Sequence, residues 1–210
     1  EGALERLALE NDLHRAIDTV VKADGRLDIL IGNAPAWTME TLIDMKWESW
    51  DYVTGVILTA SFRLGQLAAR VMRDNGGGSI AFTSSIDFKG AAPSFSHYGV
   101  AKAAIVNLVQ NMAFEFAQYN IRVNCVSPGP LNTQQSIDIV GEELMVKFRK
   151  YFPPVPLGHR LGEAEDHAAA CRAPGPGGRA DGGGQDQARE RGGVGGGGGG
   201  GGGRAPREGK

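Results

Sequence analysis

The sequence predicts an α/β fold with a parallel sheet, because three short apolar runs alternate with two long amphipathic segments. The apolar runs cover residues 28–32, 79–84 and 121–126. Helical periodicity fills the intervals between them, at 47–74 and 97–119. Crossovers of this length join neighbouring parallel strands and pack their helices on the sheet. We therefore expect a three-layer α/β/α arrangement around a parallel sheet.

The N-terminal part is predicted to be a helix followed by a buried strand. Residues 4–23 repeat apolar side chains at helical spacing, and Gly25 ends the pattern. Residues 28–32 (D-I-L-I-G) lack polar alternation, which is typical of a parallel strand buried on both faces. Residues 33–35 (N-A-P) follow as a turn.

The middle of the chain repeats this pattern twice. The helical segment 47–74 stops at the glycines 76–78, and a second buried strand is predicted at 79–84. The helical segment 97–119 leads into the third strand, which the Ser-Pro-Gly-Pro sequence at 127–130 terminates.

The C-terminal part divides into helical segments and a tail. Helices are predicted at about 137–151 and 163–170. More than half of the 32 glycines follow Cys171, and large apolar residues almost vanish there. We expect residues 1–170 to form one partial domain and 171–210 to be a disordered, low-complexity tail. The tail is either a flexible extension or a coding region read in a wrong frame.

Composition excludes several classes of function. The net charge is −2 and the pI is about 6.1, which gives no electrostatic basis for binding nucleic acid or a membrane surface. No apolar run approaches 18 residues, and the N-terminus lacks a signal-peptide pattern. The spacing of the two cysteines does not suggest a disulfide framework. A cytoplasmic protein without a metal site is expected.

The predicted topology brings three polar segments to one edge of the sheet. Right-handed crossovers place both long helices on the same face. Ligands of such sheets bind beyond the carboxyl ends of the strands. Residues 33–35, 84–85 and 128–133 directly follow the three predicted strands, so we expect the site there.

A Tyr–Lys pair supplies candidate acid–base chemistry at this edge. Tyr98 and Lys102 are four residues apart on a predicted helix, so they share one face. A nearby ammonium favours the phenolate and would lower the pKa of Tyr98. Ser85, thirteen residues before Tyr98, could hydrogen-bond a carbonyl oxygen as charge develops on it. On many helices such a pair is only a solvated Lys beside a packed Tyr, so the spacing alone does not decide.

Four ordered motifs together resemble the classical short-chain dehydrogenase/reductase family. Four parts of the family pattern have counterparts in this sequence: the Asn-Asn-Ala-Gly turn, the strand with the catalytic Ser, the Tyr/Lys motif and the Pro-Gly turn. The matching stretches are D-I-L-I-G-N-A at 28–34, S-I-A-F-T-S-S at 79–85, Y-G-V-A-K at 98–102 and R-V-N-C-V-S-P-G-P-L-N-T at 122–133. Residues 156–166 resemble the segment before the family's last helix, so the resemblance covers about residues 4–170.

The resemblance implies a Rossmann-like fold and an oxidoreductase that uses NAD or NADP. A ketone and a secondary alcohol would be interconverted, with Ser85, Tyr98 and Lys102 as catalytic residues. The implied cofactor-binding residues are Asn33, Ala34, Tyr98, Lys102, Pro128, Gly129 and Thr133. The substrate would be a small carbonyl or alcohol compound, and the intact family member a homodimer or homotetramer.

Departures from the family pattern leave a second interpretation open. No Gly-rich phosphate turn precedes residue 28, so the first βαβ unit and the last strand of the family sheet are expected to be missing. Pro35 replaces the turn glycine, and Ile57 stands where the family has an Asn of its catalytic tetrad. The alternative is therefore a catalytically impaired homologue or fragment that acts as a scaffold or oligomer partner.

Aromatic and histidine residues near the site also have two readings. They either line a substrate pocket or pack against neighbouring side chains; these residues are Trp37, Phe88, Phe95, His97 and Met145. Phe148, Tyr151 and Phe152 lie where the family has its substrate lid. His97, beside Tyr98, is expected to be exposed at the start of a helix.

Overall fold

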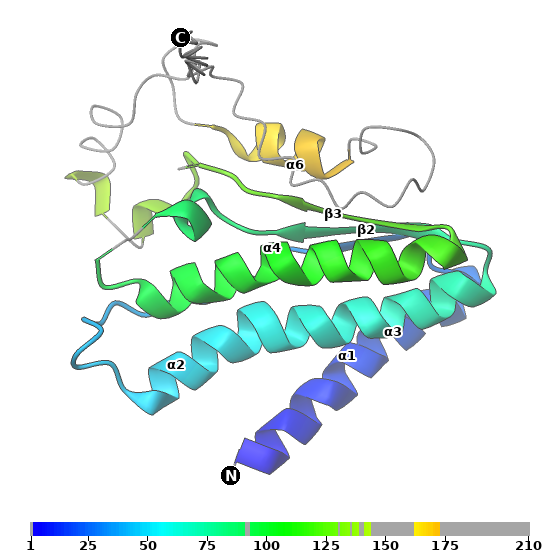
Figure 1. Cartoon of the computed structure of the whole chain (residues 1–210), viewed down its shortest axis with the longest axis horizontal. Coiled ribbons are helices and arrows are strands. Elements are labelled where there is room, and N and C mark those ends of the chain that lie inside the picture. Colours follow the sequence, from blue (N-terminus) through cyan, green and yellow to red (C-terminus); the bar gives the residue numbers. More distant parts are fainter. Residues whose placement is uncertain are drawn as a thin grey trace, which may run out of the picture.

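The computed structural model describes residues 2–90, 93–129, 131–134, 136–138, 141–143 and 162–172. The predicted alternation of strands and helices is confirmed (Figure 1). The main elements are α1 (Gly2–Asp24), β1 (Ile29–Gly32), α2 (Trp47–Thr54), α3 (Ala60–Asp74), β2 (Gly78–Thr83), α4 (Ser96–Phe116), β3 (Ile121–Val126) and α6 (Ala164–Arg172). The segments outside the described residues include most of the helix predicted at 137–151, residues 144–161 as a whole, and the tail beyond Arg172.

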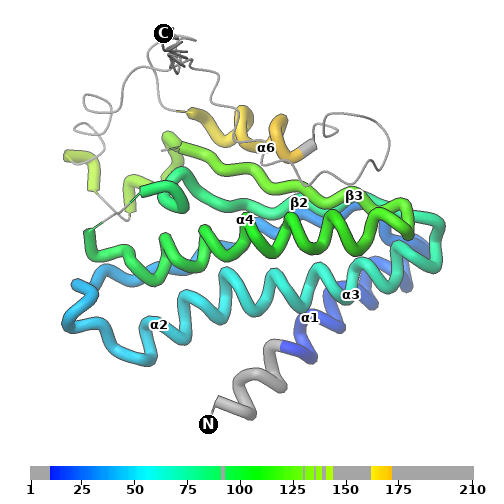
Figure 2. The backbone as a smooth tube through the Cα atoms, viewed as in Figure 1, coloured from blue at the N-terminus to red at the C-terminus, as the bar shows by residue number. Residues whose placement is uncertain are grey.

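The strands form the predicted parallel sheet, in the order β1-β2-β3. Ile31 is paired with Ala81 across β1 and β2, and Phe82 with Cys125 across β2 and β3. Helices α1 to α4 lie on one face of the sheet and α6 on the other, so the described part has three layers (Figures 1 and 2). The expectation that both long helices share a face is confirmed.

Glycines end the helices where the chain needs a positive φ. Gly25 has a φ of +72°, and its N–H donates to the carbonyl of Val21, which closes α1 as predicted. Gly77, between α3 and β2, has a φ of +126°. A Cβ there would lie 2.4 Å from the carbonyl oxygen of Asn120. Position 77 therefore requires glycine for two reasons: its φ is positive, and its backbone lies close to the residue that precedes β3.

The long helix predicted at 47–74 contains a π-helical turn at Gly55–Thr59, between α2 and α3. Ile57, within this turn, is 2% exposed and belongs to the apolar core. An apolar side chain in that position cannot hydrogen-bond a water molecule. Ile57 therefore packs in the core at the position where the family has an Asn, and its side chain cannot take part in a proton relay.

The core lies between the sheet and the helices, and Phe82 of β2 is one of its largest fully buried side chains. Two glycines make room for this ring. A Cβ at Gly32 of β1 would lie 2.3 Å from a ring carbon of Phe82, and one at Gly65 of α3 would lie 3.2 Å from another. The ring of Phe82 therefore joins β1, β2 and α3 into one packed unit.

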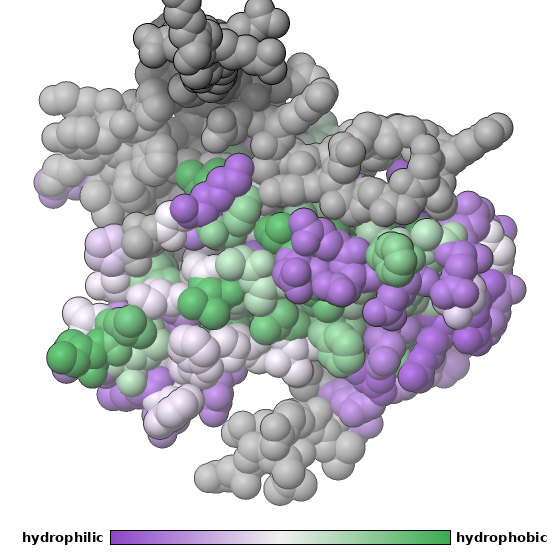
Figure 3. Space-filling model, viewed as in Figure 1, coloured by the Kyte–Doolittle hydropathy of each residue, from purple (hydrophilic) through white to green (hydrophobic). Residues whose placement is uncertain are grey.

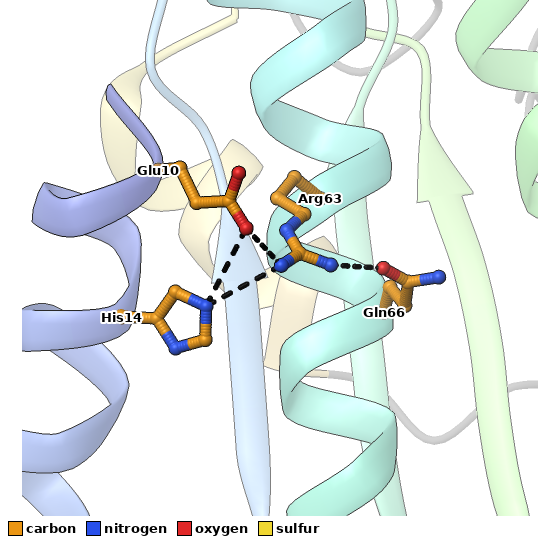
Figure 4. A network of polar contacts seen from close by, with 4 residues as sticks. All are labelled: Glu10, His14, Arg63 and Gln66. Atoms are coloured by element: carbon orange, nitrogen blue, oxygen red, sulfur yellow. Dashed lines mark hydrogen bonds and ion pairs between the residues drawn. The ribbon is translucent and has the colours of Figure 1, made fainter. Parts of the chain in front are cut away.

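A polar network fastens α1 to α3 (Figure 4). The guanidinium of Arg63, only 23% exposed, donates to the carboxylate of Glu10 and to the amide oxygen of Gln66. His14 lies 3.3 Å from the same guanidinium and 3.7 Å from Glu10. Because this charge pair is partly shielded from water, it holds the N-terminal helix against the bundle more firmly than an exposed pair would.

The expectation that residues 28–32 are buried on both faces is wrong. Ile29 is 65% exposed and Ile31 is 45% exposed. The described strands place β1 at an edge of the sheet, and α6 packs near β3 instead. β1 is therefore covered on the face where Leu30 packs against the core, whereas Ile29 and Ile31 on its other face have no covering layer among the described residues. Such an edge favours pairing with another chain.

Replacing Ile31 with lysine is expected to reduce concentration-dependent self-association, because a charge on an edge strand opposes edge-to-edge pairing. Static light scattering over a concentration series measures this. Ile43→Lys is the matched control, since Ile43 is 92% exposed and lies in the loop before α2. Figure 3 shows apolar surface over that loop as well as over the helices. An equal effect of both substitutions would attribute association to general surface hydrophobicity and contradict a role for the edge.

Candidate active site

The carboxyl ends of the three strands bring the predicted site segments together. β1 ends at Gly32, β2 at Thr83 and β3 at Val126, so residues 33–35, 84–85 and 127–129 leave the sheet at one edge. The hydroxyl of Thr83 donates to Asn33 Oδ1 at 2.7 Å. The N–H of Ile86 donates to the carbonyl of Pro128 at 3.2 Å. These contacts confirm the predicted convergence of the segments.

Two hydrogen bonds fasten the end of β2 to α4. The hydroxyl of Ser84 donates to the backbone carbonyl of Lys102 at 2.8 Å. Lys102 Nζ donates to the backbone carbonyl of Thr83 at 2.7 Å. Lys102 is 3% exposed, and this burial lowers its pKa to about 8. A charged amine is costly to bury, so its retention at this position points to a function.

Tyr98 lies one turn before Lys102 on α4, as the spacing predicts. Lys102 Nζ is 5.5 Å from the centre of its ring, and the ring of Phe95 meets it edge-on. The expectation of a lowered Tyr98 pKa is wrong. Burial raises the pKa of Tyr98, a hydrogen bond with Ser85 lowers it, and the charge of Asp87 raises it further. The cost of burying a phenolate outweighs the help from the neighbouring groups.

Ser85 begins the short 3-10 turn Ile86–Lys89 and is itself buried. Its hydroxyl donates to Asp87 Oδ2 at 2.9 Å and accepts the backbone N–H of Asp87 at 3.2 Å. Sequence reasoning missed Asp87. An Asp two residues after a Ser, in a segment that leaves a strand, is the signal that could have indicated this local pairing.

His97 is fully buried, which contradicts the expectation that it is exposed. Its Nε2 lies 2.7 Å from the hydroxyl of Thr38, in the loop between β1 and α2. Glu40 of the same loop donates its N–H to the carbonyl of Ser94. Burial lowers the pKa of His97, so the imidazole is neutral at pH 7. The loop covers the start of α4, and a local helix pattern gives no sign of such a distant segment.

Asn33 is already engaged by a residue that sequence reasoning missed. His167 Nε2, from α6, lies 3.2 Å from Asn33 Oδ1 and 3.2 Å from the hydroxyl of Thr83. Burial and the charge of Lys102 lower the pKa of His167. Ala34, the next predicted cofactor residue, is exposed at the same edge. The helix α6 thus reaches the carboxyl edge from the opposite face of the sheet.

The predicted turn after β3 is linked to the start of α6. Asn132 donates its N–H to the carbonyl of Gly162 at 2.7 Å. Gly129 is exposed, and the hydroxyl of Thr133 accepts the N–H of Ser136 at 3.1 Å. Pro130, Met145 and the lid candidates Phe148, Tyr151 and Phe152 lie outside the described residues.

The fold and the edge define a class of protein. It is a parallel α/β protein of the Rossmann-like type, with Ser85, Tyr98 and a buried Lys102 at the carboxyl ends of its strands. The family model described as enoyl-(acyl carrier protein) reductase matches residues 7–173. This chain belongs to the short-chain dehydrogenase/reductase family.

Similar proteins agree with this assignment. An uncharacterized short-chain type dehydrogenase/reductase of Sinorhizobium fredii is 38% identical over 156 residues, 73% of this chain and 60% of that protein. Human dehydrogenase/reductase SDR family member 4 is 33% identical over 172 residues, 80% of this chain and 59% of that protein. An uncharacterized NAD-dependent oxidoreductase of Mycobacterium tuberculosis is 35% identical over 153 residues, 70% of this chain and 54% of that protein.

The solved structures show the same fold. A 7α-hydroxysteroid dehydrogenase in complex with NADH and 7-oxoglycochenodeoxycholic acid is 31% identical with a TM-score of 0.71, covering 77% of this chain and 62% of that one. Levodione reductase, 24% identical with a TM-score of 0.72, covers 77% of this chain and 64% of that one and shows the fold alone. This chain spans about 60% of the length of the first of the curated relatives above.

Two further observations concern the described residues only. No helix among them is long and apolar enough to cross a membrane. They contain no group of three or more His, Cys, Asp and Glu side chains placed to hold a metal ion.

Proposed function

We propose that this protein is an NAD(P)-dependent oxidoreductase that interconverts a ketone and a secondary alcohol, with Tyr98 as the general acid and base. The observation that carries the proposal is the meeting of Ser85, Tyr98 and Lys102 at the carboxyl edge. Lys102 is the most informative of the three, because its amine is buried at an energetic cost and directed to the end of β2. The cytoplasm is the proposed location.

The raised pKa of Tyr98 keeps the phenol protonated at neutral pH. Tyr98 is then ready to donate its proton to a carbonyl oxygen during reduction. Ser85 would donate a second hydrogen bond to the same oxygen. Alcohol oxidation needs the phenolate, whose fraction increases as the pH rises toward the raised pKa. We therefore expect the rate of oxidation to increase with pH, while the equilibrium between ketone and alcohol is set by substrate and cofactor.

The residues at the nicotinamide end fit a dinucleotide cofactor, which would supply or accept the hydride. The Lys102 ammonium has three N–H donors and donates one to the carbonyl of Thr83, so the other two remain for ribose hydroxyls. The hydroxyl of Thr133 accepts the N–H of Ser136 and lies 2.9 Å from the Ser136 hydroxyl, so a carboxamide that binds Thr133 would share or replace these contacts. The exposed backbone at Gly129 leaves room beside Pro128.

Asn33 fits the cofactor through one of its two polar groups. Its Oδ1 lies within hydrogen-bond distance of both Thr83 and His167, so its acceptor capacity is used. Its amide N–H groups remain for a ribose oxygen, beside the exposed Ala34. The NAD-dependent oxidoreductase and the NADH complex among the similar proteins support a nicotinamide dinucleotide for this chain too.

A scaffold or oligomer partner is the second candidate function. It is favoured by large apolar side chains exposed on the helices of one face: Trp47 on α2, Phe62 on α3, and Val100 and Phe114 on α4. Helices with such side chains can pack against a second copy without any cofactor. We propose that the intact protein is a homodimer or homotetramer in either case.

Titration with NADH and NADPH distinguishes the two functions. We expect the cofactor's fluorescence to shift on binding, and Lys102→Met to weaken the affinity at least about tenfold, as the loss of charge-assisted hydrogen bonds predicts. Lys89→Met is the matched control, since Lys89 is exposed in the 3-10 turn after Ser85. No binding at millimolar cofactor would overturn the oxidoreductase proposal and favour the scaffold. Equal weakening by both substitutions would remove Lys102 from the cofactor site.

A further inference from the structure

We propose that Asp87 is a specificity-determining residue, which holds the hydroxyl of Ser85 and thereby selects substrates with a hydrogen-bond donor beside the reacting carbonyl. α-Hydroxy ketones and α-amino ketones belong to this class. Simple ketones would be poorer substrates, and α-keto acids the poorest. The inference rests on the proposed function, since it assigns Ser85 to the substrate oxygen.

The geometry begins with a double contact between Ser85 and Asp87. The Ser85 hydroxyl donates to Asp87 Oδ2 at 2.9 Å, while the Asp87 N–H donates to the same hydroxyl oxygen at 3.2 Å. Ser85 is buried, so water does not readily compete for its hydroxyl. The 3-10 turn Ile86–Lys89 keeps the two residues in this arrangement.

Competition for one hydrogen follows from this arrangement. A serine hydroxyl has a single O–H to donate. A hydrogen bond donated by Ser85 to Tyr98 would favour the phenolate, and Ser85 acts on the pKa of Tyr98 in that direction. Asp87, Tyr98 and a substrate carbonyl would therefore compete for the same hydrogen. A bond to a carboxylate is roughly twice as strong as one to a neutral oxygen, so Asp87 holds it in the absence of substrate.

A preferred substrate must replace the hydrogen bond that the Asp87 carboxylate loses. When Ser85 turns to a substrate carbonyl, the Asp87 carboxylate loses a donor. The substrate oxygen and the carboxylate are then within about two hydrogen-bond lengths of each other, because both lie next to Ser85 Oγ. A hydroxyl or amine on the neighbouring carbon can reach the carboxylate and replace the lost bond. A substrate carboxylate at that position would be repelled.

The charges around Tyr98 support the same conclusion. On its own helix Tyr98 has Lys102 over its ring, and His97 beside it is neutral and contacts Thr38. From the turn after β2, Asp87 supplies the negative charge. Lys89 of that turn lies over the ring of Phe88 and is exposed. Asp87 is therefore the carboxylate that acts on Tyr98 among the groups described here.

A titration of Tyr98 tests the contact without cofactor or turnover. We expect Asp87→Asn to lower the pKa of Tyr98, followed by the ultraviolet absorbance of phenolate, because it removes a charge and leaves only a neutral amide oxygen, which holds the Ser85 hydroxyl less strongly against Tyr98. Tyr98→Phe identifies this residue's signal among the four tyrosines, and circular dichroism at each pH verifies the fold. Asp51→Asn, an exposed acid on α2, is the matched control and should change nothing.

The Ser85→Ala background separates hydrogen-bond competition from charge. In this background we expect Asp87→Asn to lower the pKa of Tyr98 by less than it does in the chain with Ser85, because no hydroxyl is present that could turn to Tyr98. An equal shift in both backgrounds would reduce Asp87 to a charge effect and overturn the competition. No shift in either would remove Asp87 from the site.

Turnover of a matched panel tests the selectivity. The panel consists of a simple ketone, its α-hydroxy analogue and the α-keto acid. Asp87→Ala should lower the kcat/KM of the hydroxy ketone relative to that of the simple ketone at least about tenfold. A ratio unchanged within about twofold would overturn the selectivity. Absence of turnover on every carbonyl would instead contradict the proposed function, and the titration would still decide whether Asp87 holds Ser85.

Discussion

Replacing Tyr98 with phenylalanine is expected to lower kcat/KM for carbonyl reduction by about 10²–10⁴-fold, the range that general acid–base catalysis contributes. Phenylalanine keeps the ring and its edge contact with Phe95, so packing changes little. It removes the proton that the raised pKa of Tyr98 keeps available at pH 7. Initial rates with NADH or NADPH and a carbonyl substrate measure the effect.

Two controls separate this loss from a folding defect. Tyr52→Phe, at a 54% exposed position on α2, should leave the rate unchanged. Tyr98→Phe itself should still bind the cofactor, because the Lys102 amine stays hydrogen-bonded to Thr83. A Tyr98→Phe enzyme that keeps more than about a tenth of the activity would refute the acid–base role of Tyr98.

Replacing Phe82 with alanine is expected to lower the free energy of unfolding by about 3–5 kcal/mol, the usual cost of removing a large buried aromatic side chain. Phe82 is 1% exposed, and its ring occupies the space that Gly32 and Gly65 leave open. Neither glycine has a side chain that could fill the cavity, whereas the flexible side chain of Met112, which lies beside Gly65, can move partly into it. The cost should therefore lie within this range and not at its upper end.

Urea or guanidinium denaturation, followed by circular dichroism, measures this loss. Phe114→Ala is the matched control, because Phe114 is 76% exposed on α4 and its removal should change the free energy of unfolding by no more than about 0.5 kcal/mol. If Phe82→Ala does not fold at all, the milder Phe82→Leu should unfold at lower denaturant than the unsubstituted chain. Equal effects at positions 82 and 114 would contradict the central place of Phe82.

Local patterns were sufficient to predict the strands and long helices of the described residues and the sheet edge that carries the candidate site. Apolar runs and helical spacing indicated three strands and the intervening helices, and handed crossovers determined on which face the helices lie. The convergence of Asn33, Ser85 and Pro128 follows from the strands being parallel, because each residue comes directly after a strand. Family motifs at the same positions led to the correct family.

Long-range packing decided what these patterns could not. The burial of His97 depends on Thr38, about sixty positions away, and the engagement of Asn33 depends on His167 of α6. The raised pKa of Tyr98 reflects burial by neighbours, whereas spacing along the helix revealed only Lys102. The exposure of Ile31 depends on what lies beside β1, which an apolar run does not reveal.

Ser85, Tyr98 and Lys102 could therefore be predicted as candidate site residues from the sequence, whereas their protonation and hydrogen-bond partners depend on the tertiary structure. Residue identity and spacing depend on the chain alone. The pKa of a group depends on how much water and charge surround it, and these come from segments that are remote in sequence. Asp87 combines both kinds of information: it lies two residues after Ser85 in the chain, and its effect on Tyr98 exists only because α4 packs against the end of β2.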